Sequence, residues 1–545
     1  MFFYSSTLLL VYSLTRRLIK ALVLIYFVSD YKMCLKGVLM NRALISVYDK
    51  TGIEVCAAKL QKAGWEIVST GGTAKFLRDN GVKVREVSEV TGFPEILDGR
   101  VKTLHPLIHA PILARRIPEH LGQLDKIKAL KIGLVMINFY PFEKALAEKE
   151  KGLDFMLENV DVGGPAMVRA AAKNFPDTVV VVDAAEYLPV VERLLADGDM
   201  PLAERRRLAQ KAFAYTSFYD SLIARYLHEG QAELPPFQGV AGRKALALRY
   251  GENPHQKGAL YVSDRSSPLS LMEKLQGKEL SFNNILDMTA VYEITGEFLS
   301  AAPFCVIVKH QNPCGAALGK TQKEAFERAL AGDPQSAFGG IVAVNAPLEE
   351  ETAAAMAPIF FEVILAPDFS PAALEILRKR KNLRLIKAPL GYRETGDLRT
   401  VPGGFVFQDR DTSREDPQSF VQKTSRSPST AENDDVAFGW KIVKFVKSNA
   451  IILVRDRTLV GVGAGQMSRV DSVDIAVKKA GEKVSGSVLL SDAFFPFPDS
   501  IETAAAHGIR VAVEPGGSVK DEEVVAAAER LGMSLLFTGV RHFRH

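Results

Sequence analysis

Short apolar runs alternate with helical patterns along the first half of this chain. Each run has the length of a buried strand, and polar or glycine-rich turns separate the runs from helices that we expect to end at Ala63 and to cover residues 74–80. Strands that alternate with helices predict an α/β domain whose mostly parallel sheet is covered on both faces. The predicted strands are residues 42–47, 65–69, 82–87 and 132–138.

The second half repeats this mixture of strands and helices after a break. A segment rich in proline and glycine, from Glu233 to about Arg243, predicts the main domain boundary. The run 304–308 reads as a buried strand that ends in a turn. Farther on, residues 408–435 are polar and rich in serine, aspartate and arginine, so we expect an exposed connection between two lobes.

Two strand-to-helix turns in the first half carry groups that suit phosphate binding. The sequence Ser-Thr-Gly-Gly-Thr at 69–73 offers hydroxyls and backbone N–H groups beside a predicted helix N-terminus. Lys50 and Thr51 occupy the equivalent turn one strand earlier, so a parallel sheet would bring both turns to one edge. The alternative is ordinary turn chemistry, with Thr51 or Asp49 as a helix cap.

More cations and polar groups follow on predicted loops. Arg100 and Lys102 alternate along residues 99–106, so in an extended chain both would face one side and hold a phosphate or polarise a carbonyl. Asp161 lies just before a helix whose first residue we expect to be Pro165. The residues that could form a catalytic cluster are Lys102, Tyr140, Asp161 and Lys173, although each could instead make a structural ion pair or hydrogen bond.

These motifs together resemble the IMP cyclohydrolase domain of the bifunctional purine biosynthesis enzymes, which has a methylglyoxal-synthase-like α/β fold. The matching segments are SVYDKTG (46–52), STGGT (69–73), GRVKTLHP (99–106) and DVGGPAMVRAAAKN (161–174). The resemblance implies that Lys102, Tyr140, Asp161 and Lys173 line a site that closes the purine ring. It also implies a site for the nucleotide phosphate made of Lys50, Thr51, Ser69, Thr70, Gly72, Arg100 and Thr103.

The chain departs from that family just after the basic loop. Where the family often reads Lys-Ile-His-Gly-Gly, residues 107–111 read Leu-Ile-His-Ala-Pro. Pro111 has no backbone N–H and a fixed φ, so any backbone contact at 110–111 is expected to change. The side chains named above are unaffected.

The strongest candidate chemistry in the second half is Lys309 beside His310, at the exit of the strand 304–308. The ends of strands in α/β sheets often carry catalytic groups. A cation next to a group that titrates near neutral pH suits moving a proton while stabilising developing negative charge. The alternative is a surface lysine and a hydrogen-bonded histidine.

Other motifs of the second half have a structural and a binding interpretation each. Arg249 can grip a carboxylate or phosphate, and Asn284 precedes a helix as a cap or a ligand contact. The loop at 491–499 could stack a flat ring and bond it through Asp499, or be pinned to the core by its phenylalanines. The glycines at 461–465 give only a weak dinucleotide signal, because Gln466 stands at the last position of that motif.

Seven segments of this half resemble the AICAR transformylase domain of the same enzyme family: RYGENPHQ, KHQNPCGAA, SAFGGIVA, KSNAI, GVGAGQMSRVDS, SDAFFPFPDS and the terminal RHF. The resemblance, from about residue 42 to the end, implies two cytidine-deaminase-like lobes and a site shared in a homodimer. It implies that Lys309 and His310 are catalytic, with Asn449 beside them. The residues implied to bind the substrate phosphate, the nucleotide and the folate are Arg249, Tyr250, Arg541, His255, Asn284, Glu362, Arg469, Phe494, Phe497 and Asp499.

The resemblance therefore predicts a bifunctional enzyme with 10-formyltetrahydrofolate as cosubstrate. It would transfer the formyl group to AICAR and then close FAICAR to IMP with loss of water. We expect an IMP cyclohydrolase domain at 40–235, a transformylase domain at 243–545, and no membrane or nucleic-acid partner.

Composition agrees with an ordinary globular protein of several domains, since the 545 residues carry a net charge of only +4. Four cysteines without a CxxC pair suggest a reducing compartment and no structural zinc, so we expect a cytoplasmic enzyme without a catalytic metal. Residues 1–39 hold two apolar runs, both shorter than the roughly 18–20 residues that span a bilayer. We expect an over-extended start or leader there; a membrane anchor is the alternative.

Two rival functions have their own sequence tests. A zinc nucleoside deaminase would need H-x-E and P-C-x-x-C; Pro313 and Cys314 are present, but no second cysteine follows at the required spacing and no histidine precedes a glutamate by two residues. The other rival makes the first half a nucleotide-sensing regulatory module. It predicts that bound nucleotide affects formyl transfer while no ring closure occurs.

Overall fold

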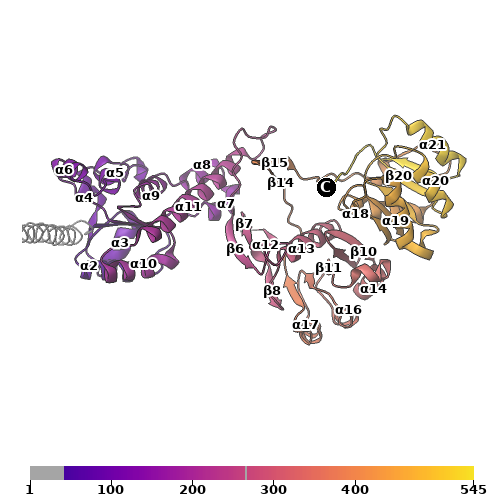
Figure 1. Ribbon diagram of the computed structural model, residues 1–545, viewed down its shortest axis with the longest axis horizontal. Helices are drawn as coiled ribbons and strands as arrows, with labels where there is room; N and C mark the ends of the chain where they lie inside the picture. Colours follow the sequence, from indigo (N-terminus) through magenta and orange to yellow (C-terminus); the bar gives the residue numbers. More distant parts are fainter. Residues whose placement is uncertain (1–41, 264–266) are drawn as a thin grey trace, which may run out of the picture. The chain divides into compact units, whose positions relative to one another are not determined.

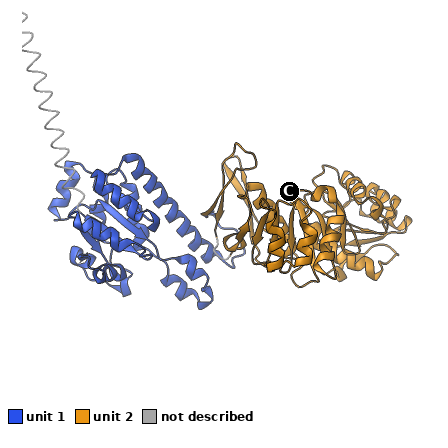
Figure 2. Cartoon of the chain, turned by 90° about the horizontal axis from the view of Figure 1, so that it is seen from below, with its two compact units in different colours: residues 1–243 blue, residues 244–545 orange. Residues whose placement is uncertain are grey.

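The structure is a computed structural model that describes residues 42–263 and 267–545. The chain divides into two compact units, the first ending at Arg243 and the second spanning Lys244–His545 (Figure 2). The predicted leader at 1–39 lies outside the described residues. Within the described ranges, no helix combines the length and the apolar character that a membrane crossing needs.

A five-stranded parallel sheet forms the centre of the first unit, in the order β3-β2-β1-β4-β5. The central strand pairs on both sides, with Ala43 opposite Ile67 on one and Leu134 on the other. Nearly every residue of β1 is buried, as its unbroken apolar run predicts for a strand covered on both faces. The strands are β1 (Arg42–Val47), β2 (Glu66–Ser69), β3 (Val84–Glu86), β4 (Leu134–Asn138) and β5 (Val179–Val181).

Helices cover both faces of this sheet (Figure 1). α2 and α10 share one hydrophobic core with the sheet, and α5, α9 and α11 share a second core on the other face. The helices are α2 (Ile53–Lys62), α3 (Gly71–Asp79), α4 (Val87–Thr91), α5 (Pro106–Leu113), α6 (Pro118–Lys126), α7 (Phe142–Leu146), α8 (Leu153–Glu158), α9 (Gly163–Lys173), α10 (Ala184–Asp197) and α11 (Leu202–His228), with 3-10 turns η1 (Leu97–Gly99) and η2 (Lys149–Lys151).

Four local predictions for this unit are wrong. The N-cap of α2 is Gly52 in a left-handed conformation, because Thr51 and Asp49 bond to each other instead. α3 begins at Gly71, so it absorbs most of the predicted glycine turn. Pro165 is the third residue of α9 rather than the first. Arg100 has helical backbone angles in a tight turn, so it and the lysine two residues on do not share a face of an extended strand.

A twelve-stranded mixed sheet forms the centre of the second unit, in the order β16-β21-β20-β19-β17-β18-β10-β9-β11-β12-β13-β8. The strands are β8 (Glu273–Gln276), β9 (Phe304–Lys309), β10 (Asn312–Leu318), β11 (Ile341–Val344), β12 (Val363–Ala366), β13 (Arg384–Lys387), β16 (Val421–Gln422), β17 (Ile451–Arg455), β18 (Thr458–Gly463), β19 (Val488–Ser491), β20 (Val511–Glu514) and β21 (Ser534–Phe537).

The two halves of this sheet have the same connectivity. In the first half, β9 runs antiparallel to β10 and β11, the strands β11 to β13 are parallel, and β8 closes the edge antiparallel to β13. The second half repeats these relations. Its strands correspond to β9, β10, β11, β12, β13 and β8 in the order β17, β18, β19, β20, β21 and β16. The halves join through β10 and β18, at Ala317 and Thr458.

Helices at equivalent positions cover both halves. α13 and α18 pack on one face of the sheet over a common core, which α12 also contacts, and the helices α14–α17 and α19–α21 lie over separate cores on the other face. The helices are α12 (Pro268–Leu271), α13 (Phe282–Thr295), α14 (Gln322–Gly332), α15 (Pro334–Ala337), α16 (Glu350–Met356), α17 (Pro371–Arg378), α18 (Thr430–Val443), α19 (Arg469–Ala480), α20 (Asp499–Ala506) and α21 (Asp521–Arg530), with 3-10 turns η3 (Pro417–Ser419) and η4 (Gly481–Val484).

The expected exposed connection at 408–435 is only partly right. It begins at the end of a separate hairpin formed by β14 (Gly396–Val401) and β15 (Gly404–Asp409), but it then contributes β16 to the large sheet and the first turn and a half of α18. Asp435, at its end, is 5 % exposed. The remaining hairpin, β6 (Arg243–Leu248) with β7 (Gly258–Val262), also stands outside the large sheet.

Candidate functional site

A cavity of ≈ 600 Å³ opens at the carboxyl ends of the central strands of the first unit. Residues just after β1, β2 and β4 line it, together with the N-termini of α3 and α9. The first N–H groups of a helix have no partner within the helix, and the helix dipole favours negative charge there. The cavity therefore suits an anionic ligand. Its predicted lining residues are Lys50, Thr70, Gly72, Arg100, Lys102, Thr103, Tyr140 and Asp161.

Lys102 is the cation closest to the start of α3. A Cβ added to Gly71 would lie 3.6 Å from the Lys102 Nζ, and one added to Gly99 would lie 3.5 Å from it. Glu95 Oε1 lies 3.5 Å from the same nitrogen. Arg100 is more exposed and pairs with Glu158 across the mouth of the cavity. The Lys102 ammonium thus lies beside a helix N-terminus, next to the two glycines Gly71 and Gly99.

Asp161 lies against the start of α9, where its Oδ1 accepts a hydrogen bond of 2.8 Å from Gly164 N. Burial raises the pKa of this carboxyl, an effect that the Gly164 N–H, the Tyr140 backbone and Lys102 oppose. A Cβ on Gly164 would come within 2.5 Å of Asp161 Oδ2, and one on Gly163 within 2.6 Å of Thr103 Oγ1. An alanine at either position would push the facing side chain aside.

Asn138 and Tyr48 belong to the cavity although the sequence analysis missed them. Asn138 Oδ1 accepts hydrogen bonds from Tyr48 N at 2.6 Å and Asp49 N at 3.0 Å, which fixes the turn after β1. The rings of Tyr48 and Tyr140 lie 5.2 Å apart. An amide at the last position of a buried strand was the available signal for Asn138.

Three predicted residues do not line this cavity. Ser69 is buried and donates its hydroxyl to Ile45 O at 2.6 Å, and the Thr51 hydroxyl donates to Asp49 at 2.6 Å. Lys173 ends α9, about 15 Å from the helix start at the usual rise per residue. It lines a different cavity with Arg169. Within one chain, Lys102, Tyr140 and Asp161 therefore line one cavity and Lys173 another, and the four-residue catalytic cluster stays a prediction.

Pro111 stands inside α5 and is buried, with its carbonyl accepting from Ile132 N at 3.2 Å. Ala110 and Pro111 are not among the residues that line the cavity. The departure from the family pattern therefore lies within α5 and outside the lining of the cavity.

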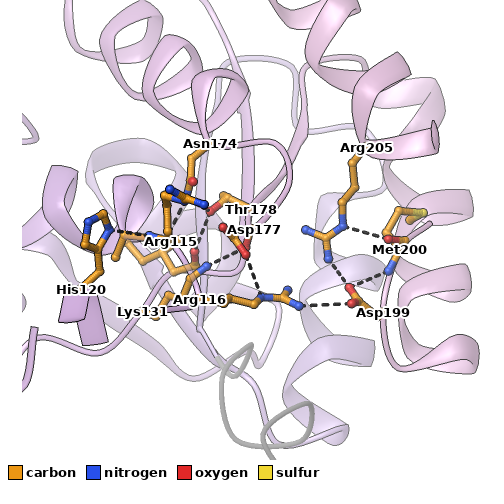
Figure 3. A network of polar contacts seen from close by, with 12 residues as sticks. Arg115, Arg116, His120, Lys131, Asn174, Asp177, Thr178, Asp199, Met200 and Arg205 are labelled. Atoms are coloured by element: carbon orange, nitrogen blue, oxygen red, sulfur yellow. Dashed lines mark hydrogen bonds and ion pairs between the residues drawn. The ribbon is translucent and has the colours of Figure 1, made fainter. Parts of the chain in front are cut away.

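A buried polar network lies at the other edge of the sheet, near the start of β4 (Figure 3). Lys131 Nζ donates to Asp177 O at 2.6 Å, and burial lowers the pKa of this lysine to about 7. Arg116 lies 3.7 Å from Asp177 and 3.2 Å from Asp199, which also pairs with the buried Arg205. The network ties the start of α11 to the sheet.

In the second unit, Lys309 and His310 lie at the hairpin between β9 and β10. Lys309 pairs with Asn312, and the two residues between them, His310 and Gln311, have φ values of 51° and 63°. Two positive φ values are characteristic of the type I′ turn that suits a two-residue hairpin. Positive φ is uncommon for residues other than glycine, asparagine and aspartate.

The neighbours of this turn hold both of its ends. Lys309 Nζ donates to Gly339 O at 2.9 Å. Asp287, on α13, accepts a 2.7 Å hydrogen bond from Gln311 N. Burial raises the pKa of Asp287, and Gln311, His310 and Lys309 oppose the rise. The sequence analysis missed this aspartate.

Asn449 is joined to the turn through the start of β17. Asn312 Oδ1 accepts from Lys447 N at 3.0 Å. Asn449 accepts from Arg469 Nη2 at 2.8 Å and donates to Gln466 O at 2.9 Å. The buried Arg469 pairs with Asp492, which is itself fully buried. Arg469 thus fixes the amide of Asn449.

The other predicted residues of this half take mixed roles. Arg249 is exposed with its guanidinium 5.1 Å above the Tyr250 ring, and Arg249 N donates to Leu280 O beside the start of α13. His255 is also exposed. Ser281 is the N-cap of α13, and Asn284, the third residue of the helix, completes the capping box by accepting from Ser281 N.

Glu362 does not present a free carboxylate, because it accepts from the buried Arg384 at 2.6 Å. In the loop at 491–499, Phe495 is fully buried and pins the loop, while Phe494 is half-buried and Phe497 is exposed. Asp499 begins α20.

Glu514 lies beneath this loop and was missed. Its Oε2 accepts from Phe495 N at 2.5 Å, and burial raises its pKa to about 8.

The C-terminal segment is tied to the rest of the unit. Its Arg541 is exposed over Phe543, but the neighbouring His542 is 1 % exposed and contacts Asp411 at 2.5 Å and Glu415 at 3.1 Å. A cavity of ≈ 940 Å³ includes Gln311, Lys447 and the last three residues of the chain in its lining.

Among the described residues, no group of three or more histidine, cysteine or acidic side chains is arranged to hold a metal ion. Cys314, the cysteine of the zinc alternative, is a free thiol on β10 whose pKa burial raises to about 12. A neutral thiol is a poor metal ligand.

Two family models match this chain, and the second match begins inside the first unit. A family model described as MGS-like domain matches residues 52–166, and one described as AICARFT/IMPCHase bienzyme matches residues 171–479. Proteins named "Bifunctional purine biosynthesis protein PurH" are similar over nearly the whole chain. That of Persephonella marina is 48 % identical over 93 % of this chain and 100 % of its own length.

The relative from Bacillus subtilis is 46 % identical over 93 % of this chain and all of its own, and that from Chloroflexus aurantiacus 50 % identical over 92 % and 98 %. A solved structure titled "Crystal structure of ForH" is 34 % identical and covers 35 % of this chain and 99 % of its own, with a TM-score of 0.32.

Proposed function

This chain belongs to the family of AICARFT/IMPCHase bienzymes, and we propose how its two units divide the two reactions of that family. It is a bifunctional enzyme of purine biosynthesis that formylates AICAR to FAICAR and then closes FAICAR to IMP. We assign ring closure to the first unit and formyl transfer to the second, with domains at 40–235 and 243–545. The formyl donor in this proposal is 10-formyltetrahydrofolate.

The observation that carries the first assignment is the cavity between the starts of α3 and α9. The nucleotide phosphate binds at the start of α3, where Thr70, Gly72 and Lys50 meet the cavity. The base then lies toward Asp161, Lys102 and Tyr140.

Ring closure forms a bond from the carboxamide nitrogen to the formyl carbon and then expels water. Lys102 and Tyr140 stabilise the oxyanion that develops on the formyl oxygen. Asp161 orients the attacking amide, and its raised pKa suits the exchange of a proton with it.

Lys173 has no part in this scheme within a single chain, because α9 separates it from the cavity. Lys173 can act in ring closure only where a second copy of the chain brings it to the cavity.

For formyl transfer, the amine of AICAR attacks the formyl carbon and tetrahydrofolate leaves. His310 takes the proton from the attacking amine. Lys309 stabilises the oxyanion or protonates the departing folate nitrogen. Of the three donors on its ammonium, the Gly339 and Phe338 carbonyls engage two, at 2.9 and 3.4 Å. Asn449 orients the substrate amide. Arg249, Tyr250 and Arg541 bind the phosphate.

We also propose that the working form is a cytoplasmic homodimer. The hairpin of β14 and β15 exposes Val401, Phe405 and Val406, and exposed apolar residues on a projecting hairpin favour a second copy as their cover.

The test is an absorbance assay that follows tetrahydrofolate release and IMP formation from AICAR and 10-formyltetrahydrofolate. We expect Asp161→Asn to release folate and accumulate FAICAR, and His310→Ala to abolish folate release while FAICAR is still closed to IMP. Loss of both activities in either variant, with the fold intact, would refute the division of the two sites.

A further inference from the structure

The turn that carries His310 makes a backbone contact to one half-buried carboxylate, that of Asp287. His310 and Gln311 both have left-handed φ, which costs on the order of 1–2 kcal/mol for each residue that is not glycine. Such a conformation persists only where surrounding groups fix it. Asp287 supplies such a contact, a charge-assisted hydrogen bond of 2.7 Å from Gln311 N to its Oδ1.

The second half of the sheet repeats this arrangement. The hairpin between β17 and β18 turns through Asp456 and Arg457, whose φ values are 53° and 55°. Asp435 accepts hydrogen bonds from both backbone N–H groups of that turn, one of them at 3.0 Å.

The two aspartates occupy the same place in equivalent helices. Asp287 comes six residues after Ser281, the N-cap of α13, and Asp435 six residues after Ser429, the N-cap of α18; both serines belong to capping boxes. Burial raises the pKa of both carboxyls. The repeat shows that an aspartate at this helix position holds a left-handed hairpin turn, whatever side chains the turn carries.

The two turns differ in what surrounds them. Arg328, on α14, donates to the Asp456 carbonyl and, at 3.1 Å, to the Thr458 hydroxyl, so the second turn fastens one half of the unit to the other. The first turn instead carries His310, directly after Lys309 in the chain, and its other residue, Gln311, lines the ≈ 940 Å³ cavity.

We propose that Asp287 is a positioning residue for formyl transfer: by fixing the backbone of the His310–Gln311 turn, it holds the imidazole of His310 where the attacking amine is deprotonated. This inference rests on the proposed function, in which His310 takes that proton. The charged and titratable groups that face Asp287 are Lys309 and His310 of the hairpin.

The experiment uses the full chain and compares Asp287→Ala, Asp287→Asn, His310→Ala and the matched control Asp435→Ala. For each, kcat and KM for AICAR are measured in the formyl transfer assay, together with closure of FAICAR and the melting temperature. If either alanine variant fails to fold, the corresponding asparagine variant replaces it.

We expect Asp287→Ala to lower kcat for formyl transfer by roughly 10–100-fold, the cost of a misplaced catalytic group, with little change in KM and none in ring closure. Asp287→Asn keeps an oxygen that accepts the Gln311 N–H, so it recovers most of the rate. Asp435→Ala lowers the melting temperature and leaves kcat within about twofold.

Two results would overturn the inference while the proposed function stands. One is a kcat for Asp287→Ala within twofold of the unaltered enzyme while His310→Ala is inactive. The other is a parallel loss of kcat and stability in the Asp287 and Asp435 variants, which would make both aspartates purely structural. Full formyl transfer by His310→Ala would instead refute the assignment of His310, and the role of Asp287 with it.

Discussion

At the scale of single residues, the candidate ring-closing site includes two glycines whose missing side chains leave space for polar groups of the cavity. Gly163 and Gly164 begin α9, and each leaves room for a polar side chain of the cavity. Thr103 approaches the first glycine and Asp161 the second. A methyl group at either position would displace the side chain that faces it.

We therefore expect Gly164→Ala to lower the rate of FAICAR closure by about 100-fold and to leave formyl transfer unchanged, since the added Cβ would lie 2.5 Å from Asp161 Oδ2. The two separate activity assays check this. Gly122→Ala in α6 is the control, because its Cβ meets no atom within 4 Å. An unimpaired Gly164→Ala enzyme would show that the position of Asp161 does not limit ring closure.

The sequence located residues of one cavity where candidate chemistry and strand ends coincide. Lys102, Tyr140 and Asp161 line one cavity because each follows or precedes a buried element at the same edge of the sheet. Lys173 lines another cavity of the same chain, because shared motif membership says nothing about distance along an eleven-residue helix. Asp287 was missed because its partner lies 24 residues away, and no local pattern encodes that pairing.

At the scale of elements, strands were easier to predict than the segments that join them. The continuous apolar runs of β1 and β9 mark buried strands without ambiguity. The polar stretch at 408–435 was predicted to be an exposed connection throughout. It contains the two-residue strand β16 and the polar start of α18, and neither has an apolar run that the sequence analysis could recognise. The equivalence of α13 and α18 became evident only once the sheet order was known.

The loop at 491–499 gives a prediction at this scale, because Glu514 anchors it through Phe495 N. Burial raises the pKa of Glu514 from 4.5 to about 8, so the folded state holds its proton more tightly than the unfolded state does. This contribution to stability is fully present below pH 4.5 and is lost as the pH rises through about 8, at about 1.4 kcal/mol per pH unit between these values.

We expect Glu514→Gln to remove this dependence. Thermal unfolding at pH 6 and pH 8 should show a loss of stability in the unaltered protein that exceeds the loss in the variant by on the order of 2 kcal/mol. The comparison between the two proteins cancels other titrating groups. Equal losses in both proteins would show that Glu514 is ionised in the folded state at pH 6.

At the scale of the whole molecule, two units with separate cores carry two consecutive reactions. In the proposed division, the product of the second unit is the substrate of the first, and one polypeptide guarantees equal amounts of the two catalysts. Nothing in the chemistry requires the intermediate to pass directly between the units, since FAICAR is a stable small molecule.

Mixing two half-active variants tests this independence. We expect a 1:1 mixture of Asp161→Asn and His310→Ala chains to convert AICAR to IMP, because FAICAR released by the first is closed by the second. The measurement is IMP formation against time, with each variant alone as control. A mixture that accumulates FAICAR and forms no IMP, although His310→Ala closes added FAICAR, would show that transfer must occur within one assembly.

The left-handed turn at His310 and Gln311 also determines which substitutions a selection for stability would favour. Glycine adopts positive φ without a steric penalty. Gln311→Gly would therefore remove up to about 1 kcal/mol of backbone strain from the turn and raise the free energy of unfolding. The same change would let the His310 imidazole adopt more positions, so catalysis would slow. Thermostability and turnover are opposed at this one position, so a search for stabilising substitutions that scores melting temperature alone would select against the chemistry.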